Sequence, residues 1–148
     1  MLTHKLDLAA DVHDQDVMCI HTTLPAYLFV FRLNRLLGLS LSRSKEDLTL
    51  HSASYAFAVY EYESSVMQQS WRVVENRRTA SHALDSGGLF AQLDQSAFLF
   101  PQLDRVDLLV CVTDLTTSIQ KKIQQIAHVL SCYKLPKNQY KIKELLTF

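Results

Sequence analysis

The stretch "FLFPQLDRVDLLVCV", residues 98–112, sets one proline, two acids and one arginine against an almost continuous apolar run. In its last seven residues only Asp107 interrupts the apolar side chains, so both faces of a strand here would be hydrophobic. This pattern is typical of a central strand that is buried on both sides. Pro101 lacks a backbone donor and therefore belongs before the strand or at a sheet edge. The stretch predicts the centre of a sheet, which the chain enters through a solvated turn at Asp104 and Arg105.

Asp107 allows two interpretations. In the structural one, its carboxylate lies at the rim of the sheet and accepts hydrogen bonds from backbone N–H groups or a nearby arginine, because buried acids normally find partners. In the functional one, the same carboxylate orients a ligand at the end of a strand. The structural interpretation is favoured, and nothing in the sequence prefers the functional one.

Alternating apolar and polar residues predict several more strands, bounded by polar or turn-forming residues. We expect strands within residues 16–23, 39–50, 54–64 and 69–77, and one or two between 97 and 113. The tail, residues 138–148, is compatible with a closing strand or with a helix.

Two helices are predicted. The first lies within residues 24–38, with Pro25 in its first turn and Gly38 at its end. It has a broad apolar face that Phe29 and Val30 extend well around the cylinder, and that comprises Tyr27, Leu28, Phe31, Leu33, Leu36 and Leu37. Such a helix is either deeply buried or in contact with another subunit.

The second helix is predicted over residues 114–133, because its isoleucines continue into one stripe at helical spacing. The stripe consists of Ile119, Ile123, Ile126, Leu130 and Tyr133. Strands gathered between two helices predict an α+β fold, a mostly antiparallel sheet with two helices packed on one face. We expect an elaborated ferredoxin-like or ACT-like sandwich. No internal repeat or linker argues for a second domain, so residues 1–148 are predicted to form one domain.

The totals restrict the class of protein. Fifteen basic and fifteen acidic residues cancel, so no global field favours nucleic acid as a partner, and self-association is favoured instead. The three cysteines are far apart and form no CxxC pair, which indicates reduced thiols in a cytoplasmic protein. The N-terminal residues do not have the apolar run of a signal peptide. The apolar run around "PAYLFVF" is far too short to span a membrane, so no membrane partner is expected.

The segment "FPQLDRVDLL" resembles the motif of the IPExxxVDY family of uncharacterised bacterial proteins. Pro101, Val106 and Asp107 match that motif, whereas Phe100, Gln102 and Leu108 stand where the family has Ile, Glu and Tyr. The order of other segments is similar over nearly the whole chain. The resemblance implies a single small cytoplasmic domain and brings no assigned activity. If the family's Glu were catalytic, Gln102 could not replace it, because an amide does not ionise.

No catalytic residue, metal site or cofactor is predicted. The six histidines have no ligand spacing, and the chain has no nucleophile elbow, phosphate-binding loop or dinucleotide fingerprint. Consecutive N–H groups at a Gly-Gly turn can form an anion nest, although a tight turn explains the same residues. The candidate ligand-binding residues are Arg43, Ser86, Gly87, Gly88 and Asp107.

Three functions are therefore carried forward. The preferred one is a non-catalytic interaction or assembly module that forms a homodimer, because the first helix and the aromatic strand have more large apolar residues than one face needs. The interface candidates are Tyr27, Phe29, Val30, Tyr60 and Tyr62. The alternative is an ACT-like regulatory domain that binds a small metabolite. An enzyme ranks third, since no acid, base or nucleophile can be named with a partner.

Overall fold

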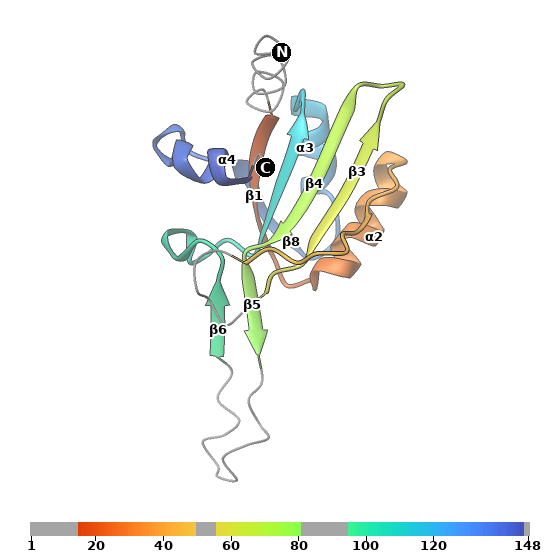
Figure 1. Ribbon diagram of the computed structural model, residues 1–148. Coiled ribbons are helices and arrows are strands. Elements are labelled where there is room, and N and C mark those ends of the chain that lie inside the picture. Colours follow the sequence, from red (N-terminus) through yellow and green to blue (C-terminus); the bar gives the residue numbers. More distant parts are fainter. Residues whose placement is uncertain (1–14, 50–55, 81–94, 147–148) are drawn as a thin grey trace.

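The computed structural model describes residues 15–49, 56–80 and 95–146, and it is an α+β fold built on a six-stranded antiparallel sheet (Figure 1). The strands lie in the order β2-β3-β4-β7-β1-β8. Their bounds are β1 Gln15–Thr22, β2 Ser42–Arg43, β3 Val59–Ser64, β4 Gln69–Glu75, β7 Leu108–Thr113 and β8 Val129–Lys134. A separate antiparallel pair is formed by β5 (Arg77–Ala80) and β6 (Gln95–Phe98).

Strand β7 lies inside the sheet, between β4 and β1, as the apolar run predicted. Its side chains alternate between two buried clusters, because successive residues of a strand point to opposite faces. Leu108 and Val110 belong to the core on one face, whereas Leu109 and Cys111 belong to the core on the other. The strand therefore requires cover on both faces of the sheet.

Helices supply that cover from opposite sides (Figure 1). Helices α2 (Ala26–Leu37) and α3 (Thr117–Gln124) pack on one face, where Phe29, Leu33 and Ile123 are fully buried. The prediction of two helices on one face is thus confirmed. The other face is covered by the chain entering β7, including a short 3-10 helix (Pro101–Leu103), and by α4 (Tyr140–Leu146). The C-terminal tail is therefore helical over these residues.

The second helix is shorter than its apolar stripe predicted. It ends at Gln124, and the chain turns at His128, whose φ of 72° lies in the left-handed region that a right-handed helix cannot continue through. The residues that follow form edge strand β8, paired with β1. Leu130 and Tyr133 are thus strand residues rather than part of a buried helical stripe, and Leu130 is 72% exposed.

The ferredoxin-like expectation remains a prediction at the level of topology. Strands β1 and β7 are each followed by a helix on the same face, as a β-α-β-β-α-β plan requires. However, β2 and β3 come between α2 and β4, and the β5–β6 pair comes between β4 and β7.

Asn76, directly after β4, holds the entry to β7 in place. It is the most deeply buried polar residue described, with no exposed surface. Its side-chain amide donates to the carbonyl oxygens of Leu103 (2.9 Å) and Val106 (2.8 Å). Its Oδ1 accepts from the N–H of Phe100 (2.9 Å), and its backbone N–H donates to the carbonyl of Asp107 (3.0 Å). One side chain therefore satisfies three backbone groups of a segment that would otherwise be buried without partners.

Replacing Asn76 with alanine should destabilise the protein by about 3 kcal/mol, because the backbone partners of its side chain lose their hydrogen bonds without gaining water. Urea denaturation followed by circular dichroism measures the change. Asn138→Ala is the matched control, since Asn138 is exposed, and should change the free energy of unfolding by less than about 0.5 kcal/mol. Equal effects of the two substitutions would contradict the role given to Asn76.

Candidate functional site

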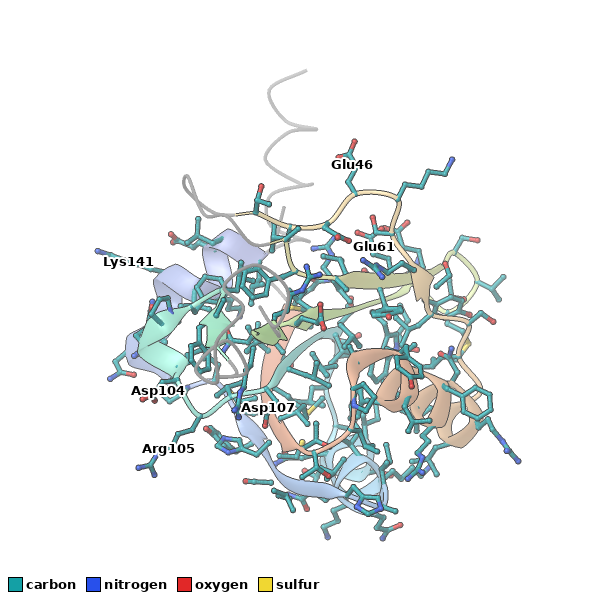
Figure 2. The ribbon with its side chains drawn as sticks, turned by 90° about the horizontal axis from the view of Figure 1, so that it is seen from below. Glu46, Glu61, Asp104, Arg105, Asp107 and Lys141 are labelled. Atoms are coloured by element: carbon teal, nitrogen blue, oxygen red, sulfur yellow. The ribbon has the colours of Figure 1, made fainter. Side chains whose placement is uncertain are left out.

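The Asp107 carboxylate has a structural role. Its Oδ2 accepts a hydrogen bond from the backbone N–H of Thr22 at 2.9 Å, and its Oδ1 lies 3.6 Å from Nη1 of Arg77. Figure 2 shows Asp104 and Arg105 at the outside of the turn, whereas Asp107 lies closer to the sheet. The carboxylate thus ties the end of β1 to the entry of β7, and these contacts match the structural interpretation.

The structure places Arg43 and Asp107 at two adjoining hollows near the start of α2. One hollow, of about 600 Å³, is bordered by Asp107, and the other, of about 210 Å³, by Arg43. Pro25, Ala26, Glu75 and Arg78 border both. Sequence reasoning did not connect the two residues, because 64 positions separate them and only the fold brings them to one surface.

The polar groups around these hollows already have partners in the protein. Glu75 Oε1 accepts from the N–H of Ala58 at 2.7 Å, and Arg78 Nη1 donates to the carbonyl of Ala56. Arg43 is paired with Asp47 at 2.6 Å. A small polar ligand would have to compete with these bonds, which weakens the case for a dedicated ligand site.

Ser86, Gly87 and Gly88, the other candidate ligand residues, lie outside the described residues. Tyr60 borders the smaller hollow, and Arg43 lies over its ring at 5.9 Å. Burial raises the pKa of the Tyr60 phenol above its ordinary value.

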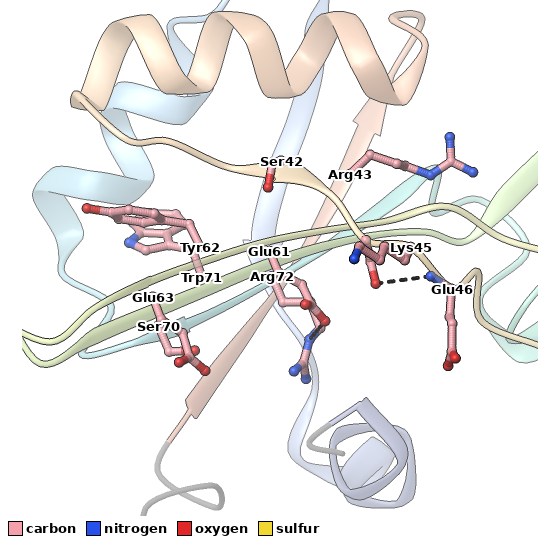
Figure 3. Close-up of a pocket in the computed structure, with 11 residues that line it drawn as sticks. Ser42, Arg43, Lys45, Glu46, Glu61, Tyr62, Glu63, Ser70, Trp71 and Arg72 are labelled. Carbon is pink, nitrogen blue, oxygen red and sulfur yellow. Dashed lines mark hydrogen bonds and ion pairs between the residues drawn. The ribbon is translucent and has the colours of Figure 1, made fainter.

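A third hollow, of about 570 Å³, lies where the loop after β2 meets β3 and β4 (Figure 3). Glu61 and Arg72 point to the same side of the sheet there, and Tyr62 and Trp71 point to the other. Glu61 Oε1 is 3.5 Å from Arg72 Nε, and Arg72 Nη1 donates to the carbonyl of Leu146 at 2.8 Å. This charge pair links the two strands to α4.

The three cysteines are free and buried. Desolvation by burial raises the pKa of Cys19 and of Cys132 to about 11 and that of Cys111 to about 12. Because the thiolate is the nucleophilic form, these side chains are poor nucleophiles at neutral pH.

The described part of the chain offers neither a cluster of metal ligands nor a membrane-spanning helix. No three His, Cys, Asp or Glu side chains in it come together as metal ligands would. No helix in it is long and apolar enough to cross a membrane.

The exposed apolar residues of α2 form the clearest candidate surface. Tyr27, Phe31 and Leu36 are 65%, 55% and 43% exposed. Phe31 and Leu36 border a groove of about 600 Å³ between α2 and the turn from α3 to β8, whereas Tyr27 borders the smaller hollow at Arg43. We call the former the α2 groove, and it is lined by Leu28, Phe31, Arg32, Arg35, Leu36, Gln125, Ile126 and Ala127.

The interface residues expected from the sequence are divided by this structure. Phe29, Val30 and Tyr60 are buried in the core, so their side chains have no surface to offer a partner. Tyr62 is partly buried against the same core, and Tyr27 alone of the five is highly exposed. The apolar surplus on α2 is real, but it lies on Phe31 and Leu36 instead.

The sequence contained a signal for this division. Ala26, Phe29, Val30 and Leu33, the buried residues of α2, follow the spacing i, i+3, i+4 and i+7 that a core-facing stripe requires. Once they are assigned to the core, Phe31 falls on the side that also carries Arg32 and Arg35. Choosing the broad face that contains Phe31 and Leu36 placed the surplus on the wrong residues.

A scan against models of known protein families finds no family that matches this chain, and a search of the curated proteins finds no match. The resemblance to the IPExxxVDY family therefore stays a prediction.

Ellman's reagent at about pH 8 should react with the native protein about 100-fold more slowly than with the urea-unfolded protein, because the raised thiol pKa values leave little thiolate.

The raised pKa values of these thiols also predict that the stability of the protein depends on pH. Each thiol is neutral in the folded state up to a higher pH than in the unfolded state, so stability is intact below about pH 9 and falls as the pH rises toward 11. Fast labelling of the native protein, or equal stability at about pH 8 and pH 10 in urea titrations, would contradict this prediction.

Proposed function

We propose that this protein is a non-catalytic interaction module and that the outer surface of α2 binds another protein chain. The observation that carries the proposal is the exposed pair Phe31 and Leu36 in the lining of the α2 groove, with a third exposed apolar residue, Tyr27, on the same helix. Aromatic side chains with nearby arginines are the residues that protein interfaces favour at their centres. Apolar surface that is buried on binding contributes roughly 25 cal/mol per Å² to the free energy of association, so these three residues supply a useful anchor.

The proposal is supported by what the hollows offer. Arg43, Glu75, Arg78 and Asp107 are bonded within the protein, and the buried thiols are held neutral. A small-molecule site normally presents several polar groups that converge on one concave, mostly apolar space, and the bonds of these four side chains run to other parts of the protein instead. The ACT-like and enzyme alternatives therefore have less support than the interaction module.

A homodimer, expected from the neutral composition, is one form that this proposal can take. The surface through which it forms would be centred on Phe31 and Leu36, because Phe29, Val30 and Tyr60 belong to the core. A different protein is the other form. The two give crosslinked products of different mass.

A photoreactive phenylalanine analogue at position 31, introduced into the chain in its own host cell, should yield a discrete crosslinked product. The same analogue at position 66 is the control, because Val66 is 90% exposed in the turn between β3 and β4 and does not line the α2 groove. A product at twice the chain mass identifies a second copy, and any other mass identifies a different protein. Equal products from both positions, or none from position 31, would refute the proposal.

A further inference from the structure

The α2 groove is flanked by cations and by no acidic residue of its own elements. Neither residues 17–45 nor residues 115–143 contain Asp or Glu, and these two segments include α2, α3 and β8. Arg32 donates from Nη1 to the carbonyl of Ala127 at 3.2 Å, which holds the far wall of the groove. Arg35 lies 5.9 Å over the ring of Phe31, so the exposed aromatic residue is itself covered by a cation.

The zero net charge of the chain conceals this separation. Lys121 and Lys122 are exposed on α3, four and three residues before Gln125, the first of the α3–β8 turn residues that line the groove. Acidic side chains lie on other elements, for example Glu61 on β3 and Asp104 before β7. Because screening limits a charge to about 8 Å at physiological salt, a partner at the groove experiences the local cations rather than the net charge.

We infer that the α2 groove binds an acidic amphipathic helix of another protein, with its apolar stripe on Phe31 and Leu36 and its carboxylates toward Arg32, Arg35, Lys121 and Lys122. This inference rests on the proposed function and names the partner of the same surface. Apolar contact supplies the anchor, and opposite charge at the rim supplies orientation and selectivity.

A helix fits this groove better than an extended segment. The walls are a helix and a turn, and the backbone N–H and C=O groups of α2 are used within the helix itself, so an extended chain has no sheet edge to pair with. The nearest edge strand, β8, is partly occupied. The carbonyl of Cys132 accepts from the side-chain amides of Gln120 (3.2 Å) and Gln124 (2.9 Å). A helical partner satisfies its own backbone and needs only side-chain contacts.

A second copy of this chain is a poorer match. A two-fold dimer presents the same patch from both sides, which would bring the arginines of one copy toward those of the other. Among the helices that the structure describes, only α4 contains an acid, Glu144, and it carries Lys141 and Lys143 as well. A bilayer is also a poorer match, because the principal apolar side of α2 is already packed on the sheet.

The test is a displayed library of helical peptides with leucine at i, i+3, i+4 and i+7 and random residues at the flanking positions. The library is selected on the full-length protein, and peptides that also bind the Phe31→Glu variant are removed. We expect the remaining peptides to be enriched in Asp and Glu at the flanks. Peptides that depend on Phe31 without acidic enrichment would overturn this inference while supporting the proposed surface, whereas no Phe31-dependent peptide would count against both.

Charge reversal then tests the cations one at a time with the best selected peptide. Arg35→Glu and Lys122→Glu should each weaken its Kd by about tenfold, and the loss should shrink at high salt. Lys141→Glu is the matched control on the opposite side of the sheet and should leave the Kd within about twofold of wild type. Thermal unfolding shows whether each variant is folded. Because two cations are replaced separately, the test still works if one variant does not fold. Unchanged affinity in both folded variants overturns the inference.

Parallel measurements on the same protein test the two other candidate occupants of the groove, a second copy of the chain and an anionic membrane. A solution mass of twice the chain that falls to one chain in Phe31→Glu would assign the groove to a second copy. Flotation with phosphatidylserine vesicles that is lost in Phe31→Glu would assign it to an anionic membrane. Either result would overturn the acidic helix.

Discussion

The burial of β7 on both faces is the constraint on which the rest of the structure depends. A strand whose side chains are apolar on both sides cannot leave either face to water, so one layer of helices is not enough. On one face α2 and α3 provide the cover, and on the other face α4 and the entry segment do. That entry segment brings backbone groups into the core, and Asn76 satisfies them. The hydrogen bonds of Asn76 to the segment before β7 are thus a consequence of burying the strand.

The strongest local patterns predicted the corresponding parts of the fold. The apolar run of β7, the alternation of β3 and the end of α2 at Gly38 each follow from contacts within a few residues. Asn76 was missed because its partners lie 24 to 30 positions ahead, and the strand pattern of residues 69–77 contains no signal of those contacts. The boundary after α3 was missed for a different reason. A residue with positive φ at His128 and a vacant edge beside β1 decide it, and neither is visible as periodicity.

The sequence indicated surplus apolar residues on the first helix, but two of the residues chosen for the interface, Phe29 and Val30, are buried in the core. Surplus apolar residues on the first helix indicated an interface, and the structure retains that surplus on its outer side. Its assignment to Phe29 and Val30 failed because a helix that is apolar nearly all round has no unique inner face by composition alone. The core stripe at i, i+3, i+4 and i+7 resolves the ambiguity, since only those positions reach the sheet together. Phe31 and Leu36 lie outside that stripe and stay exposed.

The arrangement of charges around the α2 groove indicates which kind of partner the apolar surface would bind. A neutral chain could distribute its acids evenly, and an even surface would favour self-association through any apolar patch. Here two long segments without Asp or Glu meet at the α2 groove, although they are separated by 69 positions in the chain. Folding therefore creates a local field that the totals conceal, and it does so beside the most exposed aromatic residues of α2. We infer that this groove, whose charged lining residues among those described are Arg32 and Arg35, disfavours its own copies and favours acidic helices, because like charges raise the cost of one association and opposite charges lower that of the other.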